Sequence, residues 1–403
     1  MSTRCERPRG ADQDGAVAVL IALLAVVLFV MAAFAVDLGN AYAISRQLSV
    51  SADASALSAA QKVNQLLGVG APCDPAALNV PSVTSVATTT NAQNDRSGKS
   101  TVTSVQVSCT SHGVEVTVAN SRTVPTVFAG VVGISTMTPS ASATAVVQVP
   151  SAVLGGLRPI AACVNDVTGA FRSSSNFFVY ISKSAGACGS TVPSQWGYVN
   201  FTDQGTDPAF MGSQAFGTAF TSGTPAYFPG LGSTGCGAST VTAGANAPCQ
   251  SDWIVNGYAG PFYAPNVSVP GSSVTGLAGN TGFVASTQSD VVGLVGKLIQ
   301  LPVVTTYNAA TQRFDVVGVV TVKVCAVAWT KNPPTPSGTT SCTNSAQPPA
   351  WVIGNPPTPI GPNEAALWVQ PVTYATSGVF GGRTDCQIGD ACDLGTRSIS
   401  LFK

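Results

Sequence analysis

The residues of this chain that could carry chemistry are few, and their types argue against catalysis. The sequence of 403 residues holds one histidine, His112, and eleven cysteines. A single histidine leaves little room for a Ser-His-Asp or Cys-His arrangement, because these need an imidazole beside the nucleophile. We therefore expect no catalytic residues and no enzyme activity.

The cysteines favour disulfide bonds over a metal site. Ten follow an apolar segment near the N-terminus, and only Cys5 precedes it. Zinc is the alternative, but the tight two-residue Cys spacings of zinc sites are missing. Disulfide bonds persist outside the cytosol, so we predict that the ten are oxidised, with neighbours in sequence order as candidate pairs and the connectivity left open. They are Cys73, Cys109, Cys163, Cys188, Cys236, Cys249, Cys325, Cys342, Cys386 and Cys392.

Two further motifs match binding sites only in part. Residues 293–297 read Gly-Leu-Val-Gly-Lys, without the longer gap and the following Ser or Thr of a phosphate-binding loop. Near the C-terminus, three aspartates surround two cysteines without the regular Asp-x-Asp spacing of a calcium loop. We expect an acidic loop closed by a disulfide there, and no metal or cofactor. The aspartates are Asp385, Asp390 and Asp393.

Charge and length limit the partners and the architecture. Charged residues make up 9% of the chain, with 18 basic and 18 acidic side chains, so no basic surface suggests a nucleic-acid partner. A chain of 403 residues exceeds the usual size of one domain. We therefore expect two folded units.

The elements that position these residues begin with a membrane segment. Residues 16–36 are 21 positions without a charge, an amide or a hydroxyl. As a helix they span about 30 Å, the thickness of bilayer hydrocarbon. Arg4, Arg7 and Arg9 precede this segment, whereas Arg46 is the only basic residue soon after it. The positive-inside rule predicts a cytoplasmic tail of residues 1–15 and an extracytoplasmic remainder in a bacterial cytoplasmic membrane.

A cleaved signal peptide and a buried core helix are the alternatives to a spanning helix. Residues 33–35 read Ala-Phe-Ala, a small-x-small pattern that a signal peptidase accepts. The apolar run is longer than the roughly 7 to 15 residues of a signal peptide, and the helical pattern continues past Asp37. A buried core helix would show a polar stripe, which is missing. We expect a retained anchor, and later trimming stays open.

The helix is predicted to continue beyond the membrane, over residues 37–67, until Gly68, Gly70 and Pro72 end it. Small and apolar residues recur there at steps of three or four, which places them on one face. That face either packs against neighbouring subunits, as small residues allow, or docks on this protein's own β-domain. Its members are Ala41, Ile44, Leu48, Ala52, Ala56, Ala59, Val63 and Leu66.

Strand patterns dominate the remaining chain, so the predicted fold class is α+β, with antiparallel, disulfide-containing β-domains after the long helix. Residues 73–150 form a small β-domain, in which residues 114–119 alternate between apolar and polar and residues 111–113 make a hairpin turn with His112. Residues 155–403 form a second, Cys-rich β-domain with a Pro-rich segment at 331–362.

The second unit carries aromatic and β-branched stretches that should supply its core. Exposed aromatics could instead form a carbohydrate-binding platform, but in a Gly-rich β-domain such residues usually pack in the core or in strand pairs. The stretches are residues 177–181, 196–201, 253–258 and 316–324.

Several of these features together resemble a known family. Residues 15–19 (Gly-Ala-Val-Ala-Val), the apolar run, and residues 36–39 (Val-Asp-Leu-Gly) are followed by Tyr42, residues 46–48 (Arg-Gln-Leu) and residues 52–57 (Ala-Asp-Ala-Ser-Ala-Leu). This combination closely resembles the N-terminal region of TadE/TadG-like proteins of the Flp (tight adherence) pilus. Residues 124–129 (Val-Pro-Thr-Val-Phe-Ala), Gly133 and a strand at 141–145 extend the resemblance.

The resemblance implies a single-pass, pilin-like or pilus-accessory protein whose long helix carries an extracytoplasmic domain. Members that are processed like prepilins have a Gly followed at the fifth position by Glu, whereas Gly10 is followed by Gly15 and Gly15 by Leu20. We therefore expect no prepilin-type processing. Some relatives carry a metal-binding von Willebrand type A domain, but the stretch from Asp53 lacks the second Ser, so no such site is expected.

The resulting hypothesis is a non-enzymatic structural or assembly component of a Flp (Tad) type pilus or a related secretion apparatus. Its expected partners are the lipid bilayer and pilus-assembly or pilin-like proteins. The alternative is a membrane-tethered surface adhesin or carbohydrate-binding protein with the same anchor.

Overall fold

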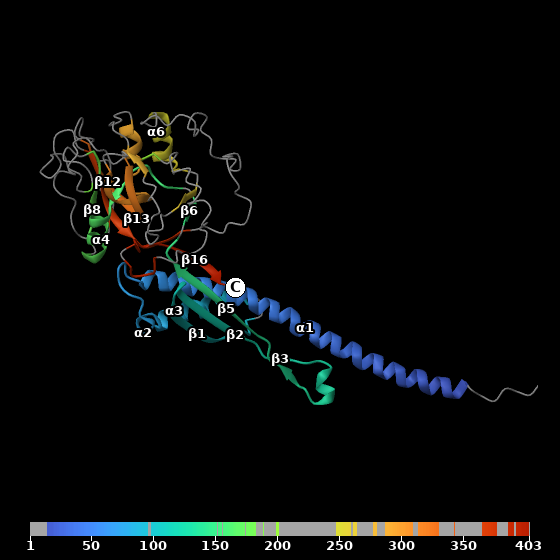
Figure 1. Cartoon of the computed structure of the whole chain (residues 1–403). Coiled ribbons are helices and arrows are strands. Elements are labelled where there is room, and N and C mark those ends of the chain that lie inside the picture. The colour runs from blue at the N-terminus through green and yellow to red at the C-terminus, as the bar shows by residue number, and fades with distance from the viewer. Residues whose placement is uncertain are drawn as a thin grey trace, which may run out of the picture.

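The computed structural model describes residues 14–95, 98–150, 152–154, 156–173, 175–182, 188, 199–200, 247–258, 261–263, 277–279, 287–308, 313–329, 342, 365–376, 386–390 and 392–402. One helix, α1 (Asp14–Leu66), runs without a break through both predicted helical segments. Its C-terminal half lies against the folded body, and its N-terminal half extends away from it (Figure 1). The long apolar helix, the following β-sheets and the disulfides confirm the predicted α+β fold class.

The first sheet lies along the C-terminal half of α1, and its strand order is β1-β2-β5-β16-β15. β1 and β2 form the predicted hairpin, with Ser111 and His112 in the turn. Gly113 takes a φ of 130°, and a Cβ there would collide with the Val147 carbonyl oxygen, so only glycine fits. The strands are β1 (Thr101–Thr110), β2 (Gly113–Ser121), β5 (Ser140–Gln148), β15 (Tyr374–Thr376) and β16 (Thr396–Phe402).

The order of this sheet brings the C-terminal end of the chain back to the N-terminal helix. β16 pairs antiparallel with β5, although more than 240 residues separate them, and α1 contacts both strands. The valines of β2 and β5 that face α1 build one core with it, including Val116, Val118 and Val147. In Figure 1 the C-terminus accordingly lies beside α1.

Two helices that were not expected from the sequence complete this unit: α2 (Pro75–Leu78) and α3 (Pro81–Asn94). α3 packs on α1 through Val83, Ala87 and Asn91, which recur at steps of four and are buried. Its many Thr and Ser residues have low helix propensity, so the tertiary contact with α1 outweighs the local preference.

The second sheet has the order β7-β12-β13-β11-β9, with β14 pairing both β13 and β8. Its core includes Val320, Val322 and Leu367, and the helix α4 (Val164–Ser173) packs on it. The strands are β7 (Ala162–Cys163), β8 (Phe177–Ser182), β9 (Val199–Asn200), β11 (Leu277–Gly279), β12 (Leu298–Asn308), β13 (Arg313–Trp329) and β14 (Ala365–Val372).

Smaller elements complete the described part. The stretch 253–258 supplies core residues as expected, but from a helix, since Trp253 and Ile254 are buried in α6. Of the stretch 196–201 the structure describes only 199–200, and of the Pro-rich segment 331–362 only Cys342. The elements are β3 (Val124–Pro125), η1 (Ala129–Val132), β4 (Thr136–Met137), β6 (Ala152–Leu154), α6 (Ala247–Val255), β10 (Pro261–Tyr263) and α7 (Gln288–Val292).

Among the described residues, four disulfide bonds join cysteines that are neighbours in sequence order. The bond between Cys73 and Cys109 ties the segment after α1 to β1. Cys236 and the side chain of Cys249 lie outside the described residues. The other three bonds are Cys163–Cys188, Cys325–Cys342 and Cys386–Cys392.

Candidate functional site

The N-terminal half of α1 is an uncovered apolar cylinder. An 18-residue window of this helix has a mean hydropathy of 3.2, and none of the window is buried. Large side chains such as Leu20, Leu24 and Phe29 stand exposed. Exposing so much apolar surface to water is unfavourable, whereas a bilayer solvates it. The apolar helix and the disulfides of the later domains therefore suggest a membrane anchor with extracytoplasmic domains.

The C-terminal half of α1 packs its small-residue face on the protein's own domain. Six of the eight predicted face residues are buried: Ile44, Leu48, Ala52, Ala56, Ala59 and Val63. They lie against α3, β2, β5 and β16. Ala41 is half-buried, and Leu66 is exposed at the last position of the helix. Of the two alternatives left open by the sequence, the structure therefore has this face docked on its own β-domain.

A buried polar cluster fixes the position of α1 against α3 and β2. Ser51 donates to Asn91 Oδ1 at 2.7 Å, and Asn120 donates to the same oxygen at 3.1 Å. The Asn120 amide also donates to the Leu48 carbonyl oxygen at 3.1 Å. Because buried polar groups are costly when unpaired, these hydrogen bonds favour the observed register of the helix on the domain.

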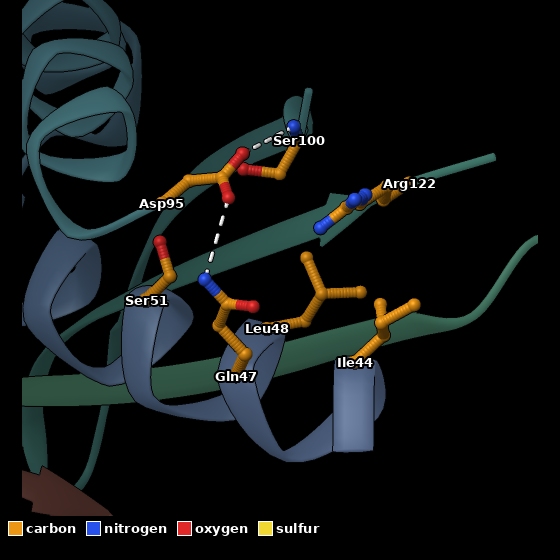
Figure 2. A pocket seen from close by; sticks show the side chains of 7 residues that line it. All are labelled: Ile44, Gln47, Leu48, Ser51, Asp95, Ser100 and Arg122. Atoms are coloured by element: carbon orange, nitrogen blue, oxygen red, sulfur yellow. Dashed lines mark hydrogen bonds between the residues drawn. The ribbon is translucent and has the colours of Figure 1, made fainter. Parts of the chain in front are cut away.

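Beside this cluster lies a shallow hollow, shown in Figure 2. Asp95 accepts from the backbone N–H of Ser100 at 2.6 Å and from Gln47 Nε2 at 3.5 Å. The hollow leaves no room for a water-sized sphere. Its polar groups therefore hold α1, the end of α3 and the start of β1 together, and do not form a ligand pocket. The remaining lining residues are Ile44, Leu48, Ser51 and Arg122.

Asp37 is the most distinctive polar residue of α1, because it follows the apolar run directly and is nevertheless buried. Its carboxylate accepts three backbone N–H groups, from Val127 at 3.0 Å, Phe128 at 3.0 Å and Ala129 at 2.7 Å. The hydrogen bond from Ala129 is foremost in lowering the pKa of Asp37, and those from Val127 and Phe128 add to it against the opposing effect of burial. The ionised carboxylate thus latches the segment between β3 and β4 to the membrane-proximal helix.

This lowered pKa predicts a pH-sensitive latch. The contribution of Asp37 is fully present above the pKa of an unfolded aspartate, about 4, and is lost as the pH falls through the lower folded value. Amide hydrogen exchange of Val127, Phe128 and Ala129, corrected for intrinsic rates, should therefore be slow at pH 7 and become faster as the pH falls below the pKa of an unfolded aspartate and through the lower folded value. The same amides in Asp37→Asn should exchange rapidly over the whole of this pH range. Equal protection in the variant and in the native chain at pH 7 would show that the carboxylate is not the latch.

A second set of buried polar contacts lies at the C-terminal end of α1. Arg397 of β16 is fully buried and donates to the carbonyl oxygens of Leu67 at 3.1 Å and Gly68 at 3.0 Å. Leu67 and Gly68 follow directly after Leu66, the last residue of α1, where the C-terminal end of the helix dipole favours a cation. Asp393, also buried, holds the guanidinium through an ion pair of 2.7 Å. The C-terminal strand is thereby tied to the residues that follow α1.

The remaining candidate residues from the sequence, His112 and the acidic loop near the C-terminus, make contacts that hold the fold together. His112 lies in the predicted turn and stacks on Phe402 with ring centroids 5.6 Å apart. Cys386, Asp390 and Cys392 lie close enough to be compared with a metal site, but the two sulfurs are joined in a disulfide and are not free to coordinate. Asp385 lies outside the described residues.

The comparisons with known proteins identify the N-terminal part of the chain. Residues 15–62 match the model of a family described as "Putative Flp pilus-assembly TadE/G-like". No curated protein and no solved structure matches the chain. The matched residues lie within α1 and include its exposed apolar half, Asp37 and most of the buried face. Residues 15–62 are therefore similar to the TadE/G-like Flp pilus-assembly domain.

Proposed function

We propose that this protein is a membrane-anchored, non-enzymatic structural or assembly component of a Flp (Tad) type pilus or a related secretion apparatus. The observation that carries the proposal is the coincidence of the TadE/G-like match at residues 15–62 with one continuous helix, apolar and uncovered at one end and docked on a folded domain at the other. Such a helix can hold an extracytoplasmic domain at a fixed distance from the membrane.

The proposed orientation places the N-terminus in the cytoplasm and the domains after α1 outside. Arg4, Arg7 and Arg9 support it through the positive-inside rule. The four disulfide bonds support it independently, because they lie after the apolar segment and require an oxidising compartment.

The side of α1 that faces away from the folded domain is exposed and is available to partner proteins. Since Ala52, Ala56 and Ala59 are occupied internally, we propose that contacts with other pilus components use the exposed apolar residues Tyr42 and Val50. They lie on the helix beyond the predicted membrane segment, where a neighbouring single-pass helix would run alongside.

A photo-crosslinking experiment tests this proposal. A photoreactive amino acid at Val50 in the full-length chain, expressed in cells that assemble the pilus, should yield adducts with other components of the apparatus. The matched control is the same amino acid at His112, which is also exposed but lies in the β1–β2 turn. Adducts with pilus components at neither position, together with binding of the domains to glycans, would favour the adhesin alternative. Among the described residues, Trp253 and Trp368 are buried, so they give a carbohydrate platform no support.

A further inference from the structure

The segment between β3 and β4 presents an apolar tip at the level where α1 leaves its apolar stretch. Val127, Phe128 and Ile134 are 69%, 44% and 49% exposed. No charged residue occurs between Arg122 and Arg158. An exposed apolar tip without charges is unfavourable in water and is typical of a surface that is covered in the native setting.

The Asp37 latch fixes the position of this tip relative to the anchor. Asp37 follows Val36, the last residue of the apolar run, and its carboxylate binds the backbone of Val127 and Phe128 directly. In Figure 1 the β3–η1–β4 segment leaves the first sheet and runs beside α1 toward the apolar half of the helix. The tip therefore lies at the C-terminal end of the apolar segment, beside Val36 and Asp37.

The segment also reaches toward the apolar residues of α1 itself. η1 and α1 are in contact. Phe34, three positions before Asp37, is 39% exposed, whereas Phe29, which lies nearer the N-terminus and farther from η1 along α1, is 75% exposed. Val36 and Leu38 beside the latch remain exposed. The tip and this part of α1 thus continue one apolar surface.

The tip is internally braced, so it can hold its shape without a partner. The Ile134 N–H donates to the Ala129 carbonyl oxygen at 3.0 Å, and the Thr126 N–H donates to the Ser135 carbonyl oxygen at 3.1 Å. The Thr126 hydroxyl donates to the Ile134 carbonyl oxygen. With the three N–H groups bound to Asp37, much of the polar backbone of the tip is satisfied, which apolar surroundings require.

We propose that Val127, Phe128 and Ile134 insert into the outer interface of the bilayer that holds α1, forming a second membrane contact latched by Asp37. The inference rests on the proposed membrane anchoring. Lipid is favoured as the occupant because the tip is continuous with the apolar half of α1 and lies level with its end. The contact would fix the tilt and rotation of the folded body on the membrane, which one helix alone leaves free.

Acyl-chain quenching tests the proposal. The full-length protein, with a fluorescent amino acid at Phe128, is reconstituted in vesicles of phosphatidylethanolamine and phosphatidylglycerol, with or without brominated acyl chains. Emission at position 128 should be quenched by the brominated lipid. The matched control is the same amino acid at exposed His112, which lies in the β1–β2 turn and should not be quenched. Asp37→Asn should reduce the quenching at position 128, whereas Asp53→Asn, a change to the same residue farther along α1, should not.

The outcomes separate this inference from the proposed anchoring. If the protein resists carbonate extraction but position 128 is not quenched, the tip does not enter the bilayer and the inference fails while the anchor stands. A photo-crosslink from position 128 to another protein and none to lipid would also overturn it. If carbonate extracts the protein, the anchoring itself is wrong.

Discussion

Replacing Arg397 with methionine is expected to destabilise the extramembrane fold by about 3 to 5 kcal/mol, because it leaves a buried carboxylate without its counterion. Asp393 is 1% exposed, and among the described residues its carboxylate would keep the backbone N–H groups of Gly389 and Gly395 as partners. The carbonyl oxygens of Leu67 and Gly68 would lose their donors as well. Urea denaturation of the detergent-solubilised full-length chain, followed by pulse proteolysis, measures the change.

Two companion variants show whether the loss comes from the buried contacts of Arg397. Arg46→Met removes an exposed arginine from α1 and should change the stability by no more than about 0.5 kcal/mol. The double variant Arg397→Met with Asp393→Leu removes both charges and should be more stable than Arg397→Met alone, since no unpaired carboxylate stays buried. If Arg397→Met unfolded at the same urea concentration as the native chain, Arg397 would not hold the end of α1.

The buried contacts of Arg397 also show which parts of the fold the sequence could not reveal. The apolar run, the continuing helix and the β1–β2 hairpin were predicted because each depends on the spacing of neighbouring residues. Arg397 and its partner Leu67 are 330 positions apart, so no local pattern connects them. The pairing of β16 with β5 was missed for the same reason.

Asp37 and Arg397 differ in how far a sequence signal could have found them. Asp37 is an acidic residue directly after 21 apolar positions, and it lies within the Val-Asp-Leu-Gly stretch on which the family resemblance rests. A carboxylate at a membrane boundary is a sign of a specific partner, although its hydrogen-bond donors, the N–H groups of Val127, Phe128 and Ala129, could be identified only from the structure. α3 gave a weaker signal, because its Thr-rich sequence does not favour a helix.

The small-residue face of α1 was recognised from its spacing, but the pattern could not say what covers it. A step of three or four residues shows that a face is buried, and small residues allow close approach both within a chain and between chains. The answer depends on β2, β5 and β16, whose arrangement is a property of the whole fold. Because this face is covered by the protein's own domain, we propose that partner proteins contact α1 through the exposed residues Tyr42 and Val50.

Ala56→Leu is expected to destabilise the isolated protein by about 1 to 3 kcal/mol, because three extra carbon atoms must fit into a packed core. Ala56 is fully buried between α1 and the first sheet, in the same core as Val116 and Val147. Ala43→Leu, the same change at an exposed position of the same helix, should alter stability by no more than about 0.5 kcal/mol.

The pair of variants distinguishes docking on the protein's own domain from docking on a neighbouring subunit. Only if the face docks on its own domain does Ala56→Leu lower the free energy of unfolding in the absence of partners. In the detergent-solubilised monomer the urea midpoint should fall for Ala56→Leu and stay unchanged for Ala43→Leu. Equal midpoints for both variants, combined with loss of pilus-component adducts only for Ala56→Leu, would mean that the face opens toward another subunit. The body would then have to detach from α1 during assembly, and the Ser51–Asn91–Asn120 cluster would have to separate with it.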